Sequence, residues 1–394
     1  MYSTVYMTRN CFSAAMAAIV AEGALTKSQT GLLTSMFYLV YAPLQIPGGM
    51  LADRYNPERL IEVGLLGTVL VNTVMFFEHN YYVMLVAWMF NAVIQAPVWS
   101  SVFKIISSQL ATEDRPIMVF LISIANSFGL VMGYVMAAFI PSWEYNFAVS
   151  AAALAVLAVC MHLLCIRYGS YTSSLDMPKQ TKNEAVPKSK APAWRLFAAS
   201  GFLLLLPAII LRSMVELSTK TFSSTMLMES YAQVSPKIGN LLNVLVLVSG
   251  ILGTLLIKLV LYPRFIKNEL SGMCIMLIAA LPFTIVLKLL GVIPVPYVVV
   301  ALCCITAATT STHLLLSYYN MSFEPYGRNA TAAGLGNAAA SIGVVFESYG
   351  FARVAESFGW SAVTSLWIIM LVVAVLCIAV AIPLSKRFKR GLAN

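Results

Sequence analysis

Charged residues are scarce in this 394-residue chain. Asp, Glu, Lys and Arg make up only 10% of it, whereas about 25% is usual for a soluble domain. Hydrophobic residues make up 60%, the mean hydropathy is +0.83, and apolar runs long enough to cross about 30 Å of hydrocarbon recur throughout. This composition excludes a soluble domain on a single anchor and predicts an integral membrane protein with many spans.

The sequence also lacks the patterns that mark metal sites, disulfide frameworks and catalytic centres. Its seven cysteines lie in apolar segments without CxxC or Cys/His spacing, as is typical of small buried hydrophobic residues. It contains no P-loop, nucleophile elbow, HExxH or dinucleotide-binding motif. We therefore expect neither an enzyme nor an ATP-driven pump, and no cofactor or metal. Because the Met1 end has no basic segment and no clear cleavage site, we expect the first helix to be retained.

The apolar segments predict an all-α membrane fold of twelve helices in two pseudo-symmetric bundles. The expected spans are residues 2–21, 28–51, 59–77, 81–107, 115–140, 145–166, 196–228, 238–261, 269–289, 296–319, 329–355 and 361–384. Residues 169–193 are rich in Ser, Thr, Lys and Pro, which is typical of a solvated linker. We therefore expect a six-helix bundle over 1–168, a cytoplasmic linker over 169–193, and a six-helix bundle with a short basic tail over 194–394.

The formal net charge of +9 has a topological explanation. Most Lys and Arg residues outside the helices fall on one side of the predicted topology, and only Lys27, Lys237, Lys288 and Arg353 fall on the other. The positive-inside rule then predicts a protein of the cell membrane with both termini in the cytoplasm. The net charge needs no nucleic-acid partner, and we expect a monomer in the lipid bilayer.

Two arginines interrupt apolar segments: Arg9 in the first, and Arg212 in the segment that opens the second half. A guanidinium stays protonated, and a charge near the bilayer midplane costs at least about 2.5 kcal/mol on insertion scales. Such residues are kept for function or for pairing. Their matching positions in the two halves predict one central site, built from both halves, for an anion.

A short internal repeat supports two related halves. Residues 125–129 (ANSFG) of the fifth predicted helix resemble residues 339–343 (AASIG) of the eleventh. Both segments occupy the same position within their half, as the two arginines do.

Residues 49–59 (GMLADRYNPER) join the second and third helices on the predicted cytoplasmic side. They resemble the signature loop of the major facilitator superfamily, in which glycine permits close helix approach and Asp with Arg forms a charge latch. The resemblance implies this latch for Gly49, Asp53 and Arg54. It also implies a transporter with its substrate site near the membrane midplane.

A second resemblance covers most of the chain. Tyr2, Tyr6 and Arg9 share one helical face at spacings of four and three. The chain is similar to the organophosphate:phosphate antiporters at these three residues, at Phe12, Tyr41, residues 53–57 and Leu211-Arg212, and over residues 333–360. In that family the arginines of the first and seventh helices clamp the substrate phosphate. The resemblance implies this role for Arg9 and Arg212, with Tyr2, Tyr6 and Tyr41 along the pathway.

The chain departs from that family at three positions. Where the glycerol-3-phosphate antiporters carry two lysines and a histidine, it has Asn10, Gln45 and Asn126. Two arginines still suit a carboxylate or a phosphate in a bidentate geometry. The weaker positive potential favours a singly charged or smaller anion over a phosphate dianion, with Gln45 and Asn126 supplying polar contacts.

Residues 41–53 also look like the anion:cation symporters, which take up sugar acids and other organic anions with protons. Those proteins commonly place an Asp directly before the first-helix arginine, whereas this chain has Thr8. A proton relay through this position therefore lacks its acid.

Three further charged groups have more than one interpretation. Arg212, Glu216 and Lys220 follow at i, i+4 and i+8, either as a structural ladder that neutralises buried charge, or with Glu216 releasing Arg212 to an incoming anion. Glu347, inside the eleventh helix, is either a coupling residue that takes up a proton or a glutamate with no role. His313 either contacts substrate or carries a proton, or it packs as a hydrogen-bonded histidine.

These patterns predict a secondary active transporter of a small organic anion, a carboxylate or phosphate ester, that works by alternating access. The driving force is either exchange with a counter-anion or symport with a proton. Two other hypotheses use the same fold: a membrane sensor that binds organic anions without transporting them, and an exporter of amphipathic compounds. Buried arginines argue against the exporter, because amphipathic cargo favours an acidic or apolar cavity.

Overall fold

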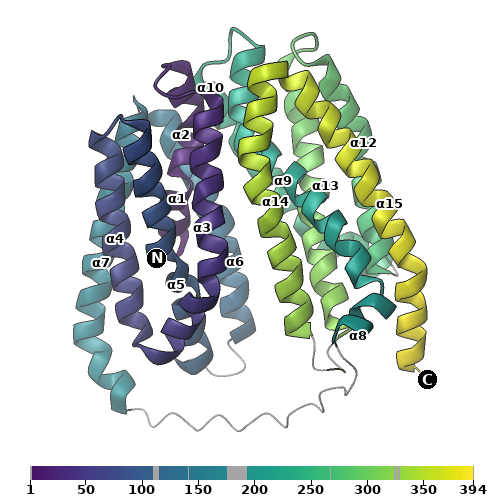
Figure 1. The fold of residues 1–394 in the computed structure, drawn as a ribbon, viewed down its shortest axis with the longest axis horizontal. Helices are drawn as coiled ribbons and strands as arrows, with labels where there is room; N and C mark the ends of the chain where they lie inside the picture. Colours follow the sequence, from purple (N-terminus) through teal and green to yellow (C-terminus); the bar gives the residue numbers. More distant parts are fainter. Residues whose placement is uncertain are drawn as a thin grey trace. The chain divides into compact units, whose positions relative to one another are not determined.

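The structure, a computed structural model, describes residues 2–109, 115–140, 142–174, 193–266, 268–323, 326 and 329–393, and the side chains of some of these residues lie outside the described part. Every secondary-structure element in these ranges is a helix (Figure 1). The chain forms two compact units. Unit 1 comprises residues 1–181 and 235–241, and unit 2 comprises residues 182–234 and 242–394.

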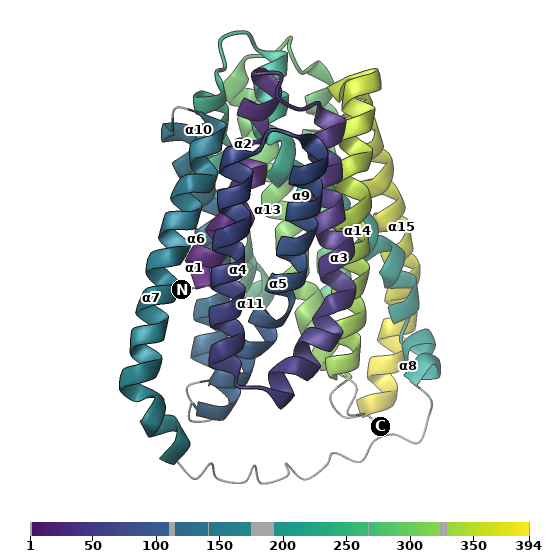
Figure 2. The same cartoon turned by 60° about the vertical axis from the view of Figure 1, so that its left-hand side comes forward.

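Unit 1 contains seven labelled helices and the first residues of an eighth (Figures 1 and 2). They are α1 (Tyr2–Arg9), α2 (Cys11–Ala21), α3 (Lys27–Arg54), α4 (Pro57–Phe77), α5 (Tyr81–Gln109), α6 (Arg115–Phe139), α7 (Trp143–Ser174) and the start of α10. Within this unit α3 and α4 both pack against α5, α4 also packs against α7, and α1 packs against α6. The helix that carries Arg9 is therefore held by contacts with α6.

Unit 2 contains the remaining helices. They are α8 (Ala193–Ala199), α9 (Phe202–Ser230), most of α10 (Pro236–Leu256) with the π-helix η1 (Ile257–Leu261) and α11 (Tyr262–Arg264), α12 (Glu269–Val286) with the 3-10 helix η2 (Leu287–Leu289), α13 (Val295–Met321), α14 (Asn329–Phe358) and α15 (Trp360–Ala393). Here α9, which carries Arg212, packs against α13, α14 and α15.

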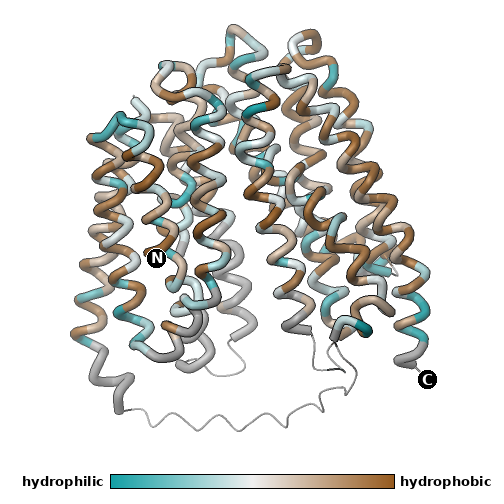
Figure 3. Tube along the Cα trace, viewed as in Figure 1, coloured by the Kyte–Doolittle hydropathy of each residue, from teal (hydrophilic) through white to brown (hydrophobic). Residues whose placement is uncertain are grey.

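The predicted all-α fold of twelve long helices is confirmed for the described residues when α1 and α2 are counted as one interrupted helix. Eight of the described helices are long and apolar enough to cross a membrane by length and composition alone. Figure 3 shows hydrophobic residues along the helices of each unit. The long helices outside this group include the interrupted first one, as well as α3, α6 and α14, where many of the predicted site residues lie.

Some predicted boundaries were wrong. The first helix is interrupted at Asn10, whose side-chain amide donates to the Tyr6 carbonyl at 2.8 Å. The predicted seventh helix divides into α8 and α9 at Gly201, which has φ +80°. A Cβ there would lie 3.1 Å from the Ala381 carbonyl of α15, so glycine permits both the turn and the close approach.

The end of α7 also differs from the prediction. The helix continues to Ser174, beyond the predicted end at residue 166 and into the first part of the predicted linker. Residues 175–192 of that linker lie outside the described residues.

One glycine in each unit brings the arginine-bearing helix close to its neighbour. A Cβ on Gly129 of α6 would collide with the Ser3 carbonyl and lie 2.8 Å from Cβ of Tyr6 in α1. A Cβ on Gly343 of α14 would collide with the hydroxyl of Ser213 and lie 2.8 Å from the Ile210 carbonyl in α9. These glycines end the two repeated pentapeptides, so the repeat marks equivalent helix contacts.

Candidate functional site

In unit 1, Arg9 lies at the end of α1, directly before the interruption at Asn10. Its side chain is largely buried, since Arg9 is only 9% exposed. Nε donates a hydrogen bond to Oε1 of Gln95 in α5 at 2.8 Å. The guanidinium carbon lies 4.9 Å from the ring centroid of Tyr6 and 4.6 Å from that of Tyr41, distances at which the aromatic rings stabilise a cation. An amide and aromatic rings thus orient this cation.

A buried polar network lies behind Arg9. The amide nitrogen of Gln95 donates to Oδ1 of Asn91 at 3.1 Å and to the Thr68 hydroxyl at 3.4 Å. All three of these residues are at most 2% exposed. Sequence analysis missed this network. Asn91 and Gln95 are polar residues four positions apart in the apolar helix α5, and that spacing was the available signal.

The other residues predicted around Arg9 have mixed outcomes. Tyr6 and Tyr41 contact the guanidinium as described, whereas Gln45, one turn after Tyr41 on α3, is exposed. The side chains of Tyr2 and Asn126 lie outside the described part of the chain. Their roles stay predictions.

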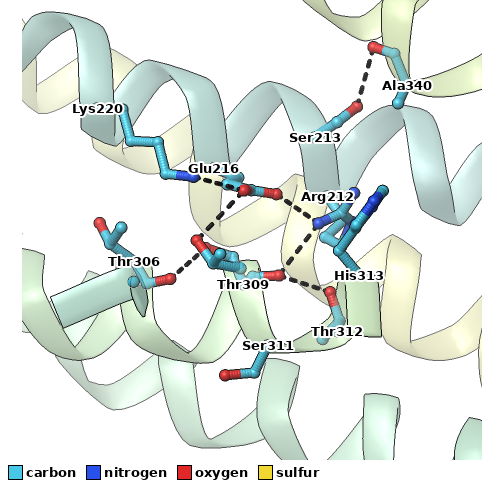
Figure 4. Close-up of polar contacts among 12 residues, drawn as sticks. Arg212, Ser213, Glu216, Lys220, Thr306, Thr309, Ser311, Thr312, His313 and Ala340 are labelled. Atoms are coloured by element: carbon cyan, nitrogen blue, oxygen red, sulfur yellow. Dashed lines mark hydrogen bonds and ion pairs between the residues drawn. The ribbon is translucent and has the colours of Figure 1, made fainter. Parts of the chain in front are cut away.

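Arg212 of unit 2 is more deeply buried, at 2% exposure. One terminal nitrogen of its guanidinium forms an ion pair with a carboxylate oxygen of Glu216 and donates to the Thr309 carbonyl of α13 at 3.1 Å (Figure 4). The Nε atom is buried and has no hydrogen-bond partner among the described residues. A carboxylate from the same helix therefore compensates the charge of Arg212. The Nε donor of Arg212 remains without a partner among the described residues.

Glu216 bridges two cations. Its other oxygen accepts from Nζ of Lys220 at 2.6 Å and from the Thr310 hydroxyl at 3.2 Å. With all three groups ionised, the Arg212–Glu216–Lys220 triad carries one net positive charge. Figure 4 shows His313 beside the triad, and the imidazole interacts electrostatically with all three of its charges. His313 is exposed. Whether it contacts substrate, carries a proton or packs as a hydrogen-bonded histidine stays a prediction.

The i, i+4, i+8 spacing thus produces the ladder that one interpretation of the sequence predicted. The position of the triad in α9 is fixed by contacts with neighbouring helices. The Ser213 hydroxyl lies 3.3 Å from the Ala340 carbonyl of α14, next to the Gly343 contact. Thr309 and Thr310 of α13 reach the triad from another helix. Whether Glu216 releases Arg212 to an anion stays a prediction.

Two remaining predictions concern Glu347 and Thr8. Glu347 is buried in α14 at 1% exposure, and one of its oxygens accepts from the Ser348 hydroxyl at 2.8 Å. Thr8, at the position where the symporters carry Asp, is fully buried, and its hydroxyl donates to the Val5 carbonyl at 3.0 Å. A local backbone hydrogen bond thus occupies the Thr8 side chain.

The predicted latch lies at the junction of α3 and α4. The α3 helix ends at Arg54, and the side chain of Asn56 caps α4 by accepting from the backbone NH groups of Glu58 and Arg59. Only the backbone of Gly49, Asp53 and Arg54 is described, so the latch stays a prediction. At the neighbouring Gly48, a Cβ would lie 3.0 Å from the Ala96 carbonyl, so close approach to α5 occurs here.

These two sites have the chemistry of anion binding. A guanidinium forms bidentate, charge-assisted hydrogen bonds with carboxylates and phosphates, and it does so most strongly where water is excluded. Unit 1 contributes the buried guanidinium of Arg9 from α1, which packs against α6 at Gly129. Unit 2 contributes that of Arg212 from α9, which packs against α14 at Gly343.

Residues 1–348 match the family model described as Major Facilitator Superfamily, so the chain belongs to this superfamily. It is therefore a multi-pass membrane protein and a secondary transporter by family, not an enzyme. The fold agrees: the chain aligns over 99% of its length, at 17% identity and a TM-score of 0.71, with the crystal structure of a bacterial homolog of the human lysosomal transporter Spinster. That alignment covers 94% of the solved chain.

Among curated proteins, the chain is similar to the membrane sensor protein UhpC of Salmonella typhimurium, with 28% identity over 181 residues. It is also similar to a probable hexose phosphate transport protein of Chlamydia pneumoniae, with 28% identity over 116 residues. The matches cover 45% and 29% of this chain, and 40% and 25% of the two relatives. The predicted resemblance to the organophosphate:phosphate antiporters is thus confirmed as distant homology.

Proposed function

We propose that this protein transports a small organic anion, a carboxylate or a phosphate ester, by alternating access. Arg9 and Arg212 each bind the anion. The observation that carries the proposal is the pair of buried guanidinium groups, 9% and 2% exposed, in the interrupted first helix and in α9. Buried cations are costly in a membrane protein, and anion binding explains their retention.

In this proposal Glu216 is an internal substitute for the substrate. While no anion is bound, its carboxylate neutralises Arg212 and is itself held by Lys220. An incoming carboxylate or phosphate forms the same charge-assisted hydrogen bonds with Arg212, and Glu216 then remains paired with Lys220. The empty carrier thereby reorients without an uncompensated cation at the Arg212 position.

The proposal is tested by uptake into proteoliposomes. Purified protein is reconstituted and offered labelled glucose 6-phosphate, gluconate and inorganic phosphate, with and without a counter-anion inside. We expect at least one of these anions to accumulate. Arg9→Ala and Arg212→Ala are each expected to reduce its uptake by about 100-fold, since truncating one partner of a buried charge pair costs about 2 to 5 kcal/mol.

The matched control is Arg353→Ala, on α14. Its guanidinium is 62% exposed and lies 3.7 Å from the Glu356 carboxylate, so its removal should leave uptake unchanged. Wild-type uptake in either Arg9→Ala or Arg212→Ala, with both proteins folded in the membrane, would refute the proposal.

The sensor hypothesis has one specific observation in its favour, because a relative matched over 45% of this chain is named a membrane sensor protein. The same preparations distinguish the two functions. A sensor binds one of these anions, which raises the unfolding temperature of the protein, but produces no flux. Accumulation of the anion in proteoliposomes excludes it.

A further inference from the structure

Two carboxyl groups in the membrane-spanning helices of unit 2, the partly buried Glu216 of α9 and the buried Glu347 of α14, are compensated differently. Glu216 pairs with two cations, Arg212 and Lys220. Glu347 accepts one hydrogen bond from the Ser348 hydroxyl through Oε2, while its Oε1 is buried and has no partner in the described part of the chain. No cation forms an ion pair with Glu347 among the described residues.

The neighbourhood of Glu347 follows from helix contacts. Ser213 of α9 contacts the carbonyl of Ala340 in α14. Further along α9, Glu229 accepts from the indole NH of Trp360 at 2.7 Å, and Trp360 begins α15 two residues after α14 ends. These two contacts show that α9 and α14 run parallel. At Gly343, a Cβ would lie 3.4 Å from the side chain of Met214.

One turn beyond this contact, the same helix faces carry Glu347 on α14 and Ser218 on α9, because residues four apart share a face. Ser218 is fully buried, and its hydroxyl also has no partner among the described residues. The contact between α9 and α14 therefore encloses an acid and a hydroxyl that each have an unused hydrogen-bonding atom.

The charges around Glu347 are already engaged or lie near helix ends. On α9, Arg212, Glu216 and Lys220 bind one another, and Glu229 binds Trp360. The α13 helix contributes His313, which interacts with that triad. On α14, Arg353 pairs with Glu356. The basic residues of α15 all belong to residues 386–390, at its C-terminal end.

We propose that Glu347 is the proton-binding site that couples transport to a proton gradient. A carboxylate buried without a cation costs several kcal/mol, and binding one proton removes its charge. The step is a reversible proton transfer from water to a carboxylate oxygen, with one proton carried for each anion. A metal cation such as Na⁺ is a poorer occupant, because the site offers few oxygen ligands. The coupling rests on the proposed anion transport, whereas the protonation itself does not.

The first test needs no substrate. Infrared difference spectra of the purified wild-type protein between acidic and alkaline pH should contain the carbonyl stretch of protonated carboxylic acids, and Glu347→Gln should lose the component that Glu347 contributes to this band. Ser348→Ala removes the hydroxyl that donates to Glu347, so the frequency of this component should change. Glu356→Gln, on the same helix but outside this cluster, is the matched control and should keep the band. A spectrum unchanged in Glu347→Gln overturns the proposal.

The second test uses proteoliposomes and the same three anions. An inward proton gradient should drive accumulation in the wild type, whereas Glu347→Gln, which imitates the protonated acid, should lose this accumulation at least tenfold and retain exchange of the anion at equilibrium. Retained exchange shows that the variant is folded. Gradient-driven accumulation equal to wild type in Glu347→Gln overturns the coupling, and so does a Na⁺ stimulation that the variant abolishes. If no anion is transported at all, the proposed function fails while the infrared result still decides the protonation.

Discussion

The two units hold their buried arginines by different means. In unit 1, the contacts of Arg9 include the Gln95 amide and the rings of Tyr6 and Tyr41. In unit 2, Arg212 is held by the Glu216 carboxylate and by a backbone carbonyl. The partners nevertheless come from corresponding helices, since α5 and α13 are the fourth long helix of their respective halves. A repeated scaffold thus places an amide beside one cation and a carboxylate beside the other.

In the proposed function, this difference predicts unlike binding steps at the two arginines. Arg212 would exchange the Glu216 carboxylate for the anion, so its binding step would include a local rearrangement. At Arg9 the anion would approach a guanidinium that the Gln95 amide orients. Substitutions of the residues around Arg9 and Arg212 test this contrast. They follow in order of decreasing expected effect.

The largest effect on stability is expected from Glu216→Gln. The substitution removes the carboxylate between the buried Arg212 and the partly buried Lys220, which lie about two helical turns apart, and leaves both cations without it. Breaking a buried ion pair from one side costs about 3 to 5 kcal/mol, and some exposure of the triad places this case at the lower end. Thermal unfolding of the purified variant measures it. Glu216→Gln combined with Lys220→Met should recover part of the loss, and the absence of any recovery would contradict the bridging role of Glu216.

Substitution of Gln95, the hydrogen-bond partner of Arg9 in unit 1, should have the next largest effect. Gln95→Glu places a carboxylate beside Arg9 and makes unit 1 resemble unit 2. We expect the protein to remain folded but anion affinity to fall about tenfold, because the new carboxylate competes for Arg9. Gln95→Ala should instead destabilise the protein by about 2 kcal/mol, the usual value for a hydrogen bond to a charged group. Binding titrations and thermal unfolding separate the two outcomes, and undiminished affinity in Gln95→Glu would show that Arg9 does not bind the anion.

The glycine contacts should respond alike in the two units. Gly129→Ala and Gly343→Ala each place a methyl group against the backbone of the arginine-bearing helix and should cost about 1 to 3 kcal/mol of stability. Gly336→Ala is the control on α14, since its Cβ would meet only Leu316 at 3.6 Å. Thermal unfolding of all three proteins checks this, and equal stability of Gly343→Ala and Gly336→Ala would contradict the close packing of α9 and α14.

The smallest effect is expected at Tyr41. Its ring lies over Arg9 and stacks against Phe37, with ring centroids 5.6 Å apart. Tyr41→Leu should weaken anion uptake about threefold, because a partly buried cation–π contact contributes about 0.5 to 1 kcal/mol. Tyr41→Phe keeps the ring and should transport like the wild type. Loss of uptake in Tyr41→Phe would instead assign the function to the hydroxyl.

Much of the site could be found from the sequence because a charge in an apolar helix stands out. Arg9, Arg212, Glu216 and Lys220 were identified in this way, and the i+4 spacing of the last three predicted their ion pairs. Gln95 was missed because an amide in a hydrophobic helix is less conspicuous. Its contact with Arg9 also joins residues 86 positions apart.

The sequence by itself determined a polytopic all-α membrane protein, its number of long helices and the identity of its buried charges, because hydrophobic length and charge are local properties. Tertiary structure decided which partner each arginine receives, since Gln95 and Thr309 come from helices distant in sequence. It also decided the close approach of Gly201 to the Ala381 carbonyl of α15, a steric limit that exists only once the helices pack.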